Sequence, residues 1–250
     1  AVICEATGAT FGRVPTADGV PQKLRQLTAR TGTLLIFDEV ISGFRVARGG
    51  AQEVYGVIPD LAVMAKSMAG GFPGGAVVGR ADVMDMLTMK DAQWNARRRI
   101  AHQGTFNANP VSAAAGLAQL RIIDEGDVIE RANTNGERLR RLLTEVSAEK
   151  DSDVVVYGTF SGFHFFCDDE DRGVTSDAIH KGEVPYGVLK GMSGAWISDF
   201  RTGMLAAGVD LVPWPGGLVS AVHTDEDLEQ TAAAFRQVLQ QLEKTAPVTA

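Results

Sequence analysis

The first half of the chain alternates short apolar runs with segments whose apolar positions recur every three or four residues. The run at 33–40 is almost entirely apolar and ends in acidic residues, which is typical of a strand covered on both faces. At 20–30, Leu24 and Leu27 have helical spacing, and Pro21 occupies a tolerated first-turn position. Strands are predicted at 2–4, 33–40, 61–65 and 75–79. This order predicts an α/β fold with an open, mostly parallel sheet flanked by helices.

The second half of the chain has a different pattern. Asn109 and Pro110 are a favourable N-cap and first-turn pair, so a helix is predicted from Pro110. Its apolar positions are expected to lie on one face: Val111, Ala114, Leu117, Ala118 and Ile122. Beyond it we expect helices at 128–150 and 196–207 and from Thr224, strands within 153–167, 209–212 and 218–222, and an irregular segment at 168–194. These elements predict a smaller α+β domain at 124–250 after a first domain at 1–123.

Composition narrows the class of protein. The 250 residues are 45% hydrophobic and 22% charged, with a net charge of −7, which is typical of a folded chain and unfavourable for broad binding to nucleic acid or anionic membranes. Two cysteines, Cys4 and Cys167, cannot form a disulfide framework, so we expect a reducing compartment and a cytoplasmic protein. The chain opens inside an apolar strand, so we expect it to be the later part of a longer chain.

Charged residues follow two of the predicted strands. Asp38 and Glu39 end one strand, and Lys66 follows the next, just before the glycine-rich segment 70–75. Because the carboxyl ends of parallel strands meet at one edge of the sheet, these groups predict a site for a flat anionic cofactor. Each signal is weak alone, since such an aspartate can cap a turn, such a lysine can be solvated, and glycines often mark turns.

Other catalytic patterns fail on their spacing. An apolar strand ending in Asp-Glu suits magnesium binding in P-loop proteins, but the nearest phosphate-loop match, Ala65-Lys66-Ser67, lacks both glycines and lies after the strand. Ser193 is followed directly by glycine and misses the nucleophile elbow. The four histidines have no paired spacing and no cysteine partner, so no metal site is expected.

Four segments together resemble one known family. They are LLIFDEVISGFR at 34–45, AKSMAGGFPGGAVVGR at 65–80, HQGTFNANPVSAAAGLAQL at 102–120 and SAVHTDEDLEQT at 220–231. In order and spacing they resemble class III pyridoxal-phosphate aminotransferases, in the branch that contains glutamate-1-semialdehyde aminomutase. The resemblance implies fold type I, a mainly parallel large domain with a smaller α+β C-terminal domain. Residues 1–123 would be the C-terminal half of the cofactor-binding domain, and 124–250 the small domain with its connecting helix.

The resemblance also implies roles for four residues. Lys66 matches the lysine that forms a Schiff base with pyridoxal 5'-phosphate and then moves the substrate proton. Asp38 matches the aspartate at the pyridine nitrogen. Val40 lies two residues further on, on the same face of an extended strand, and matches the apolar residue that packs on the ring. Thr105 matches the threonine at the cofactor phosphate of the neighbouring subunit, which implies a homodimer with a shared active site.

The sequence departs from the family pattern at two positions. Ala6 replaces an expected proline, and Pro215 stands where the aminomutases have a glutamate. The second difference favours a ping-pong aminotransferase acting on a small amine or amino acid and a keto acid or aldehyde. Glutamate-1-semialdehyde aminomutase and a non-catalytic relative remain alternatives. Arg45, Trp196 and Trp214 are equally consistent with contacting the substrate and with a structural role.

Overall fold

The computed structural model describes residues 1–245, which form two compact units. Residues 1–6 and 19–126 make the first unit, and residues 7–18 join the chain from 127 onward in the second. The boundary predicted after residue 123 assigns residues 7–18 to the first domain, whereas the structure groups them with the second unit. The assignment of 1–123 and 124–250 to the two domains of the family stays a prediction.

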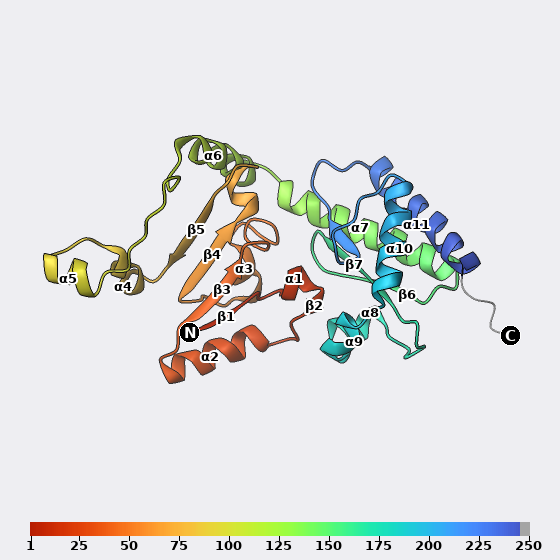
Figure 1. Cartoon of the computed structure of the whole chain (residues 1–250), viewed down its shortest axis with the longest axis horizontal. Coiled ribbons are helices and arrows are strands. Elements are labelled where there is room, and N and C mark those ends of the chain that lie inside the picture. The colour runs from red at the N-terminus through yellow and green to blue at the C-terminus, as the bar shows by residue number, and fades with distance from the viewer. Residues whose placement is uncertain (246–250) are drawn as a thin grey trace. The chain divides into compact units, whose positions relative to one another are not determined.

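The first unit is built on a four-stranded sheet in the order β1-β3-β4-β5 (Figure 1). The three strands β1, β3 and β4 are parallel, and β5 runs antiparallel to β4. The mainly parallel sheet is therefore confirmed. The strand expected at 33–40 is shorter, because the backbone N–H of Thr33 donates to Thr28 O and closes the preceding helix. The strands are β1 (Val2–Cys4), β3 (Leu35–Glu39), β4 (Leu61–Ala65) and β5 (Gly75–Gly79).

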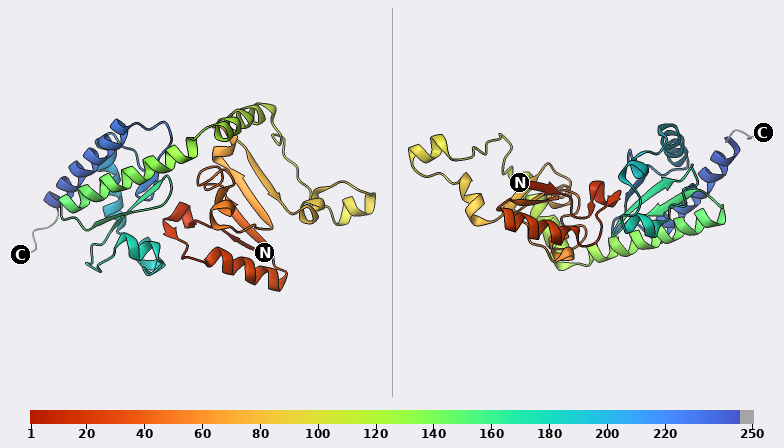
Figure 2. Two further views of the ribbon diagram at one scale, coloured as in Figure 1. Left: turned by 180° about the vertical axis from the view of Figure 1, so that it is seen from behind. Right: turned by 90° about the horizontal axis from the view of Figure 1, so that it is seen from below.

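Helices surround this sheet, and one buried carboxylate joins three of the elements. α2 ends at Gly32, whose left-handed backbone (φ 66°) lets its N–H cap Thr28 O. Asp60 accepts hydrogen bonds from Arg25 of α2, from Leu35 N of β3 and from Arg80 after β5. The helices α4 and α5 extend away from the sheet in every view (Figures 1 and 2). The helical elements are α2 (Val20–Thr31), α3 (Gly50–Tyr55), η1 (Lys66–Ala69), α4 (Ala81–Met84), η2 (Asp85–Leu87), α5 (Ala92–Arg97) and α6 (Pro110–Glu125).

Helix α6 begins as expected, but its apolar face does not form the core. Asn109 Oδ1 accepts from the N–H groups of the first turn, as an N-cap should. Val111, Leu117 and Ile122 are each more than half exposed, so these apolar positions are not part of a core in the described structure. The helix packs instead through small residues. A Cβ at Gly116 would lie 3.1 Å from Met68 O, so its backbone lies directly against η1.

The second unit is an antiparallel sheet, in the order β6-β7-β8, packed against long helices. Its core is aromatic, since the Phe165 ring lies 5.0 Å from that of Phe200 and 4.9 Å from that of Phe235. Every residue of β7 is buried. The elements are α1 (Ala9–Gly12), β2 (Val14–Pro15), α7 (Val128–Glu149), β6 (Val154–Tyr157), β7 (Gly162–Cys167), α8 (Ser176–His180), α9 (Tyr186–Lys190), α10 (Gly194–Ala206), β8 (Gly216–Leu218) and α11 (Asp225–Thr245).

A buried histidine fixes residues 7–18 in this unit. His164 Nε2 lies 3.0 Å from Phe11 O, and the side chain is 2% exposed. Burial lowers the pKa of His164 to about 4, so the ring is neutral at pH 7 and donates to that carbonyl. Tyr157 Oη donates to Arg13 O at 2.7 Å and makes a second attachment. Residues 7–18 therefore fold with the second unit.

Two parts of the second unit differ from the expected pattern. No strand forms at 209–212, because Leu211 O accepts from Arg201 and Val212 N donates to Gly216 O within a turn. The strand expected at 218–222 is β8, which begins and ends earlier. The segment expected to be irregular contains α8 and α9. Between residues 1 and 245, no helix is long and apolar enough to cross a membrane.

Candidate active site

Two neighbouring strands of the first sheet end at one edge, and each brings a predicted site residue there. Asp38 belongs to β3, and Lys66 directly follows β4. The parallel register pairs Asp38 with Val63 and Glu39 with Met64, so the two strands end side by side. Ligand sites in open parallel sheets lie beyond this edge. The structure thus places Asp38 and Lys66 together, while their roles toward a cofactor stay predictions.

Lys66 begins the turn η1 in an unusual backbone conformation. Its φ is 49°, a left-handed value that costs a non-glycine residue roughly 1–3 kcal/mol. Ala65 before it is fully extended, so the chain changes direction sharply at Lys66. The side chain is exposed, and within residues 1–245 its ammonium makes no hydrogen bond or ion pair. The turn therefore presents an unpaired primary amine.

Asp38 is half-buried and uses one carboxylate oxygen locally. Its Oδ1 accepts from Val40 N at 3.1 Å, and no other residue of the described chain hydrogen-bonds Oδ2. The expectation that Val40 continues the strand is wrong, because β3 ends at Glu39 and Val40 begins a turn. That turn brings the Val40 N–H back to Asp38. Packing of Val40 on a cofactor ring stays a prediction.

Glu39, next to Asp38, anchors the loop that follows. It is 0% exposed, and its carboxylate accepts from Ser42 Oγ at 2.9 Å, Ala51 N at 2.7 Å and Gln52 N at 3.3 Å. These hydrogen bonds offset the cost of burying the charge. Alternation along β3 puts Glu39 and Asp38 on opposite faces of the sheet. Sequence reasoning saw only an acidic strand end and missed this division of roles.

Arg45 reaches from this loop to the turn that holds Lys66. Its Nη2 donates to Ser67 Oγ at 3.3 Å. Burial lowers the pKa of Arg45, and its Nε–H is buried with no acceptor in the described structure. Arg45 follows Phe44, which is another left-handed residue with φ 57°. Ser67 was missed in the sequence, where its only signal was its position after Lys66.

Thr105 does not belong to the set of hydrogen-bonded residues at the sheet edge. It occupies an exposed turn between α5 and α6 and makes no hydrogen bond to Lys66 or Asp38. Its neighbour Phe106 is 81% exposed. The role predicted for Thr105, at the cofactor of a neighbouring subunit, stays a prediction.

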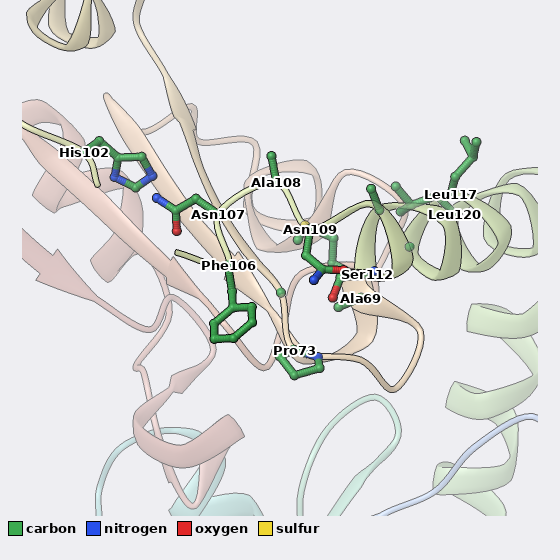
Figure 3. Close-up of a pocket in the computed structure, with 15 residues that line it drawn as sticks. Ala69, Pro73, His102, Phe106, Asn107, Ala108, Asn109, Ser112, Leu117 and Leu120 are labelled. Atoms are coloured by element: carbon green, nitrogen blue, oxygen red, sulfur yellow. Dashed lines mark hydrogen bonds between the residues drawn. The ribbon is translucent and has the colours of Figure 1, made fainter. Parts of the chain in front are cut away.

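A pocket of about 620 Å³ lies between the segment 102–109, the glycine-rich loop and α6 (Figure 3). Its lining is mainly apolar, and its polar groups come from His102, Asn107, Asn109 and Ser112. Neither Lys66 nor Asp38 lines it, although Met68 of the Lys66 turn does. The pocket is therefore next to the sheet edge and distinct from it.

The two tryptophans left open by the sequence have different environments in the second unit. Trp196 stacks on Phe200 with the ring centres 4.7 Å apart, so it belongs to the core. The Trp214 indole N–H is buried and has no partner within residues 1–245. Pro215, at the position of the expected glutamate, is buried, and its carbonyl accepts from Phe165 N at 3.0 Å.

Comparison with known sequences identifies relatives of this chain. Residues 1–199 match the profile of the aminotransferase class-III family. The glutamate-1-semialdehyde 2,1-aminomutase of Pyrobaculum arsenaticum is 37% identical over 97% of this chain and 53% of its own length. The aminomutase of Methanosarcina acetivorans is 35% identical over 94% of this chain and 51% of its own length. The chain thus spans about half the length of these relatives.

Comparison with solved structures gives the same fold. An omega-transaminase from Sphaerobacter thermophilus has a TM-score of 0.79 and 33% identity, covering 97% of this chain and 52% of that one. A transaminase with PLP bound has a TM-score of 0.76 and 27% identity, covering 96% of this chain and 52% of that one. The α/β architecture with a mainly parallel sheet is therefore fold type I.

The residues at the sheet edge fit pyridoxal phosphate, the cofactor of this family. The cofactor needs a primary amine for its aldehyde carbon and an acidic group for its ring nitrogen. The unpaired amine of Lys66 and the free Oδ2 of Asp38 are groups of these two kinds, and they belong to neighbouring strand ends. Because the family profile matches residues 1–199 and a relative is 37% identical over 97% of this chain, the chain belongs to the class III aminotransferases.

Proposed function

We propose that this protein is an aminotransferase that moves an amino group from an amine or amino acid to a keto acid or aldehyde, using pyridoxal phosphate. The proposal rests on one observation above the others. An unpaired lysine amine and a half-buried carboxylate with a free oxygen lie at the ends of neighbouring parallel strands, at Lys66 and Asp38. A non-catalytic relative has no chemical need for this pair.

The residues of the chain divide the work as follows. Bound pyridoxal phosphate supplies a conjugated ring that withdraws electrons from the substrate's α-carbon. Lys66 would hold the cofactor through its amine and, when that amine is free, would carry the proton from the substrate's α-carbon to the carbon of the cofactor that bears the nitrogen. Asp38 Oδ2 binds the ring nitrogen, where its negative charge favours the protonated form. Val40 packs against the ring and excludes water from it.

We further propose that the enzyme is a homodimer in which Thr105 binds the cofactor phosphate of the neighbouring subunit. The exposed position of Thr105 supports this assignment. So do the apolar side chains near it, since Phe106, Val111 and Leu117 are 81%, 57% and 52% exposed. Exposed apolar side chains that gather on one surface favour a protein interface.

A glutamate-1-semialdehyde aminomutase is the second candidate, supported by the names of the relatives from Pyrobaculum and Methanosarcina. Such an enzyme keeps its half-reacted substrate bound and returns the amino group to the adjacent carbon. Pro215, at the position where a glutamate is expected, removes one polar group suited to that task. This difference favours release of the product and ping-pong transfer to a second molecule.

The need for an acceptor separates the two reactions. The cofactor-loaded protein is incubated with amine donors, with and without a keto acid or aldehyde, and separately with glutamate-1-semialdehyde. Transamination requires the acceptor and gives parallel lines in double-reciprocal plots. Conversion of glutamate-1-semialdehyde to 5-aminolevulinate without an acceptor would establish the aminomutase instead. A protein that neither binds the cofactor nor catalyses either reaction would be the non-catalytic relative.

A further inference from the structure

We propose that Arg45 is a positioning residue that, through Ser67, holds the Lys66 turn in the orientation needed to attach the cofactor. This inference rests on the proposed function and assigns to that site a residue that contacts neither cofactor nor substrate. Its basis is a hydrogen bond between the loop that follows β3 and the turn that follows β4.

The loop after β3 and the turn after β4 each contain a residue with a strained backbone. Phe44, in the loop after β3, has φ 57°, and Lys66, after β4, has φ 49°. Left-handed backbone at non-glycine residues persists only where the surrounding structure enforces it, and it gathers at functional sites. Two such residues at neighbouring strand ends indicate that both turns are held in place by specific contacts.

One hydrogen bond joins the residues that follow these two positions. Arg45 follows Phe44, Ser67 follows Lys66, and Arg45 Nη2 donates to Ser67 Oγ at 3.3 Å. In residues 1–245, no other side-chain hydrogen bond reaches the turn η1. Because Ser67 is covalently next to Lys66, fixing the serine limits the directions in which the lysine side chain can leave the backbone.

Arg45 is itself well anchored at its backbone. Its N–H donates to Ser42 O at 3.0 Å, and Ser42 Oγ donates to the buried carboxylate of Glu39. A continuous set of contacts therefore runs from β3 through the loop to the Lys66 turn. At its end the turn also lies in direct backbone contact with α6, since a Cβ at Gly70 would lie 2.7 Å from Ala115 O. Both α6 and Arg45 therefore contact the turn.

The unpaired Nε–H of Arg45 supports the same role. A buried donor without an acceptor is unfavourable, and a shorter apolar side chain would avoid it. The guanidinium is also largely buried, and its side-chain hydrogen bond goes to Ser67 rather than to an open surface. Its contacts instead suit a rigid support for the neighbouring lysine.

The test measures cofactor attachment rather than turnover alone. Pyridoxal phosphate is added to cofactor-free, full-length protein, and the rate at which the near-visible absorbance develops is followed for wild type, Arg45→Met, Ser67→Ala and the double variant. Loss of the contact should slow attachment roughly three- to tenfold, the effect of losing one orienting hydrogen bond. The double variant should be no slower than Arg45→Met, because both changes remove the same contact. Ser67→Thr, which keeps the hydroxyl, should restore the rate.

Arg48→Met is the matched control. Arg48 lies in the same loop, but its guanidinium donates to Gly126 O at 3.2 Å and does not contact the Lys66 turn. It should leave the attachment rate unchanged. If Arg45→Met does not fold, Ser67→Ala still provides the measurement.

The outcomes distinguish a failure of this inference from a failure of the proposed function. Equal attachment rates in wild type and Ser67→Ala, or single effects that multiply in the double variant, would overturn the role of Arg45 alone. A wild-type protein that attaches no cofactor would instead contradict the proposed function.

Discussion

The chemistry of a lysine depends on what surrounds its amine, and Lys66 is exposed and unpaired within the described chain. Most surface lysines share those properties. The difference at Lys66 is the backbone, which is held at φ 49° directly after a strand. A strained turn that presents a free amine at the sheet edge where Asp38 also lies is a costly arrangement to keep without a function.

Lys66→Ala should abolish turnover and the near-visible absorbance of bound cofactor, because no other group replaces the amine. Lys66→Arg should fail in the same way, since a guanidinium keeps the charge but cannot form the covalent link. Absorbance spectra and steady-state rates provide the measurement, with Lys23→Ala, an exposed lysine of α2, as the control. Normal absorbance in Lys66→Ala would show that the cofactor is held elsewhere.

Asp38→Asn should still bind the cofactor but lose most of its activity. The amide has nearly the same shape, and its oxygen can still accept from Val40 N, as Asp38 Oδ1 does at 3.1 Å. It cannot stabilise a protonated ring nitrogen, so electron withdrawal weakens. We expect kcat to fall at least about 100-fold, in the range of losing a charged partner in catalysis. A kcat near that of wild type would exclude this role for Asp38.

At the scale of single residues, the sequence predicted the chemical groups of the site but not the contacts that support them. Asp38 and Lys66 were predicted to meet because parallel strands end at a common edge. Ser67 and the anchoring by Glu39 were not foreseeable, because each depends on how a loop folds back in space. The same limit applies to Val40, whose turn follows from the early end of β3.

Among the elements, strand β7 contains a buried histidine, His164, whose protonation makes the stability of the fold depend on pH. Burial holds the pKa of His164 at about 4, below the ordinary value of 6.5, so the unfolded chain binds a proton that the folded chain does not. The contribution of neutral His164 to the free energy of unfolding is therefore fully present above pH 6.5. It decreases as the pH drops towards 4, where the folded state also takes up the proton. The difference between the two values corresponds to roughly 3 kcal/mol.

Urea unfolding at pH 7 and pH 4.5 measures this dependence. His164→Gln should be less stable than wild type at pH 7 but should lose less of its stability on acidification. An unaltered acid dependence in His164→Gln would assign that dependence to another group.

In the first unit, the contribution of Asp60 is also lost in acid, but only at a lower pH. Burial raises the pKa of this carboxyl, but hydrogen bonds from Arg80, Leu35 N and Arg25 outweigh it and bring the pKa to about 2. The contribution of Asp60 is therefore present above the ordinary value of 3.8 and is lost only below it. Between pH 6.5 and pH 4, acid weakens the second unit through His164 while the Asp60 contacts persist.

Apolar runs predicted the bounds of some strands well. The strands β4 and β5 have the bounds expected from their apolar runs. Helical periodicity did not predict the packing of α6, whose apolar positions Val111 and Leu117 are exposed while the helix packs through Gly116. A hydrophobic pattern shows which face avoids water, but it does not show that the partner for that face lies in the same segment of chain.

For the whole molecule, the proposed homodimer makes a prediction about mixed subunits. If Thr105 binds the phosphate of the neighbouring subunit, each active site combines Lys66 of one subunit with Thr105 of the other. Lys66→Ala and Thr105→Ala proteins, each poorly active alone, should then regain activity when unfolded and refolded together. Random pairing gives one intact site in half of the dimers, so roughly a quarter of the wild-type activity should return.

No recovery would place Thr105 in the same site as its own Lys66, or outside the active site. Size-exclusion chromatography of the refolded mixture checks that dimers formed. Refolding each variant with wild type provides the control for losses during refolding.

The buried carboxylate of Glu39 also bears on how this scaffold can be redesigned for new substrates. Because Glu39 fixes Ser42 and the start of α3, random changes at these positions would release the entire loop rather than reshape it. Positions 41 and 47 lie in the same loop, are not fully buried, and make no side-chain contact with that carboxylate. A combinatorial library confined to such positions would explore variation near the strand ends while most of its members still fold.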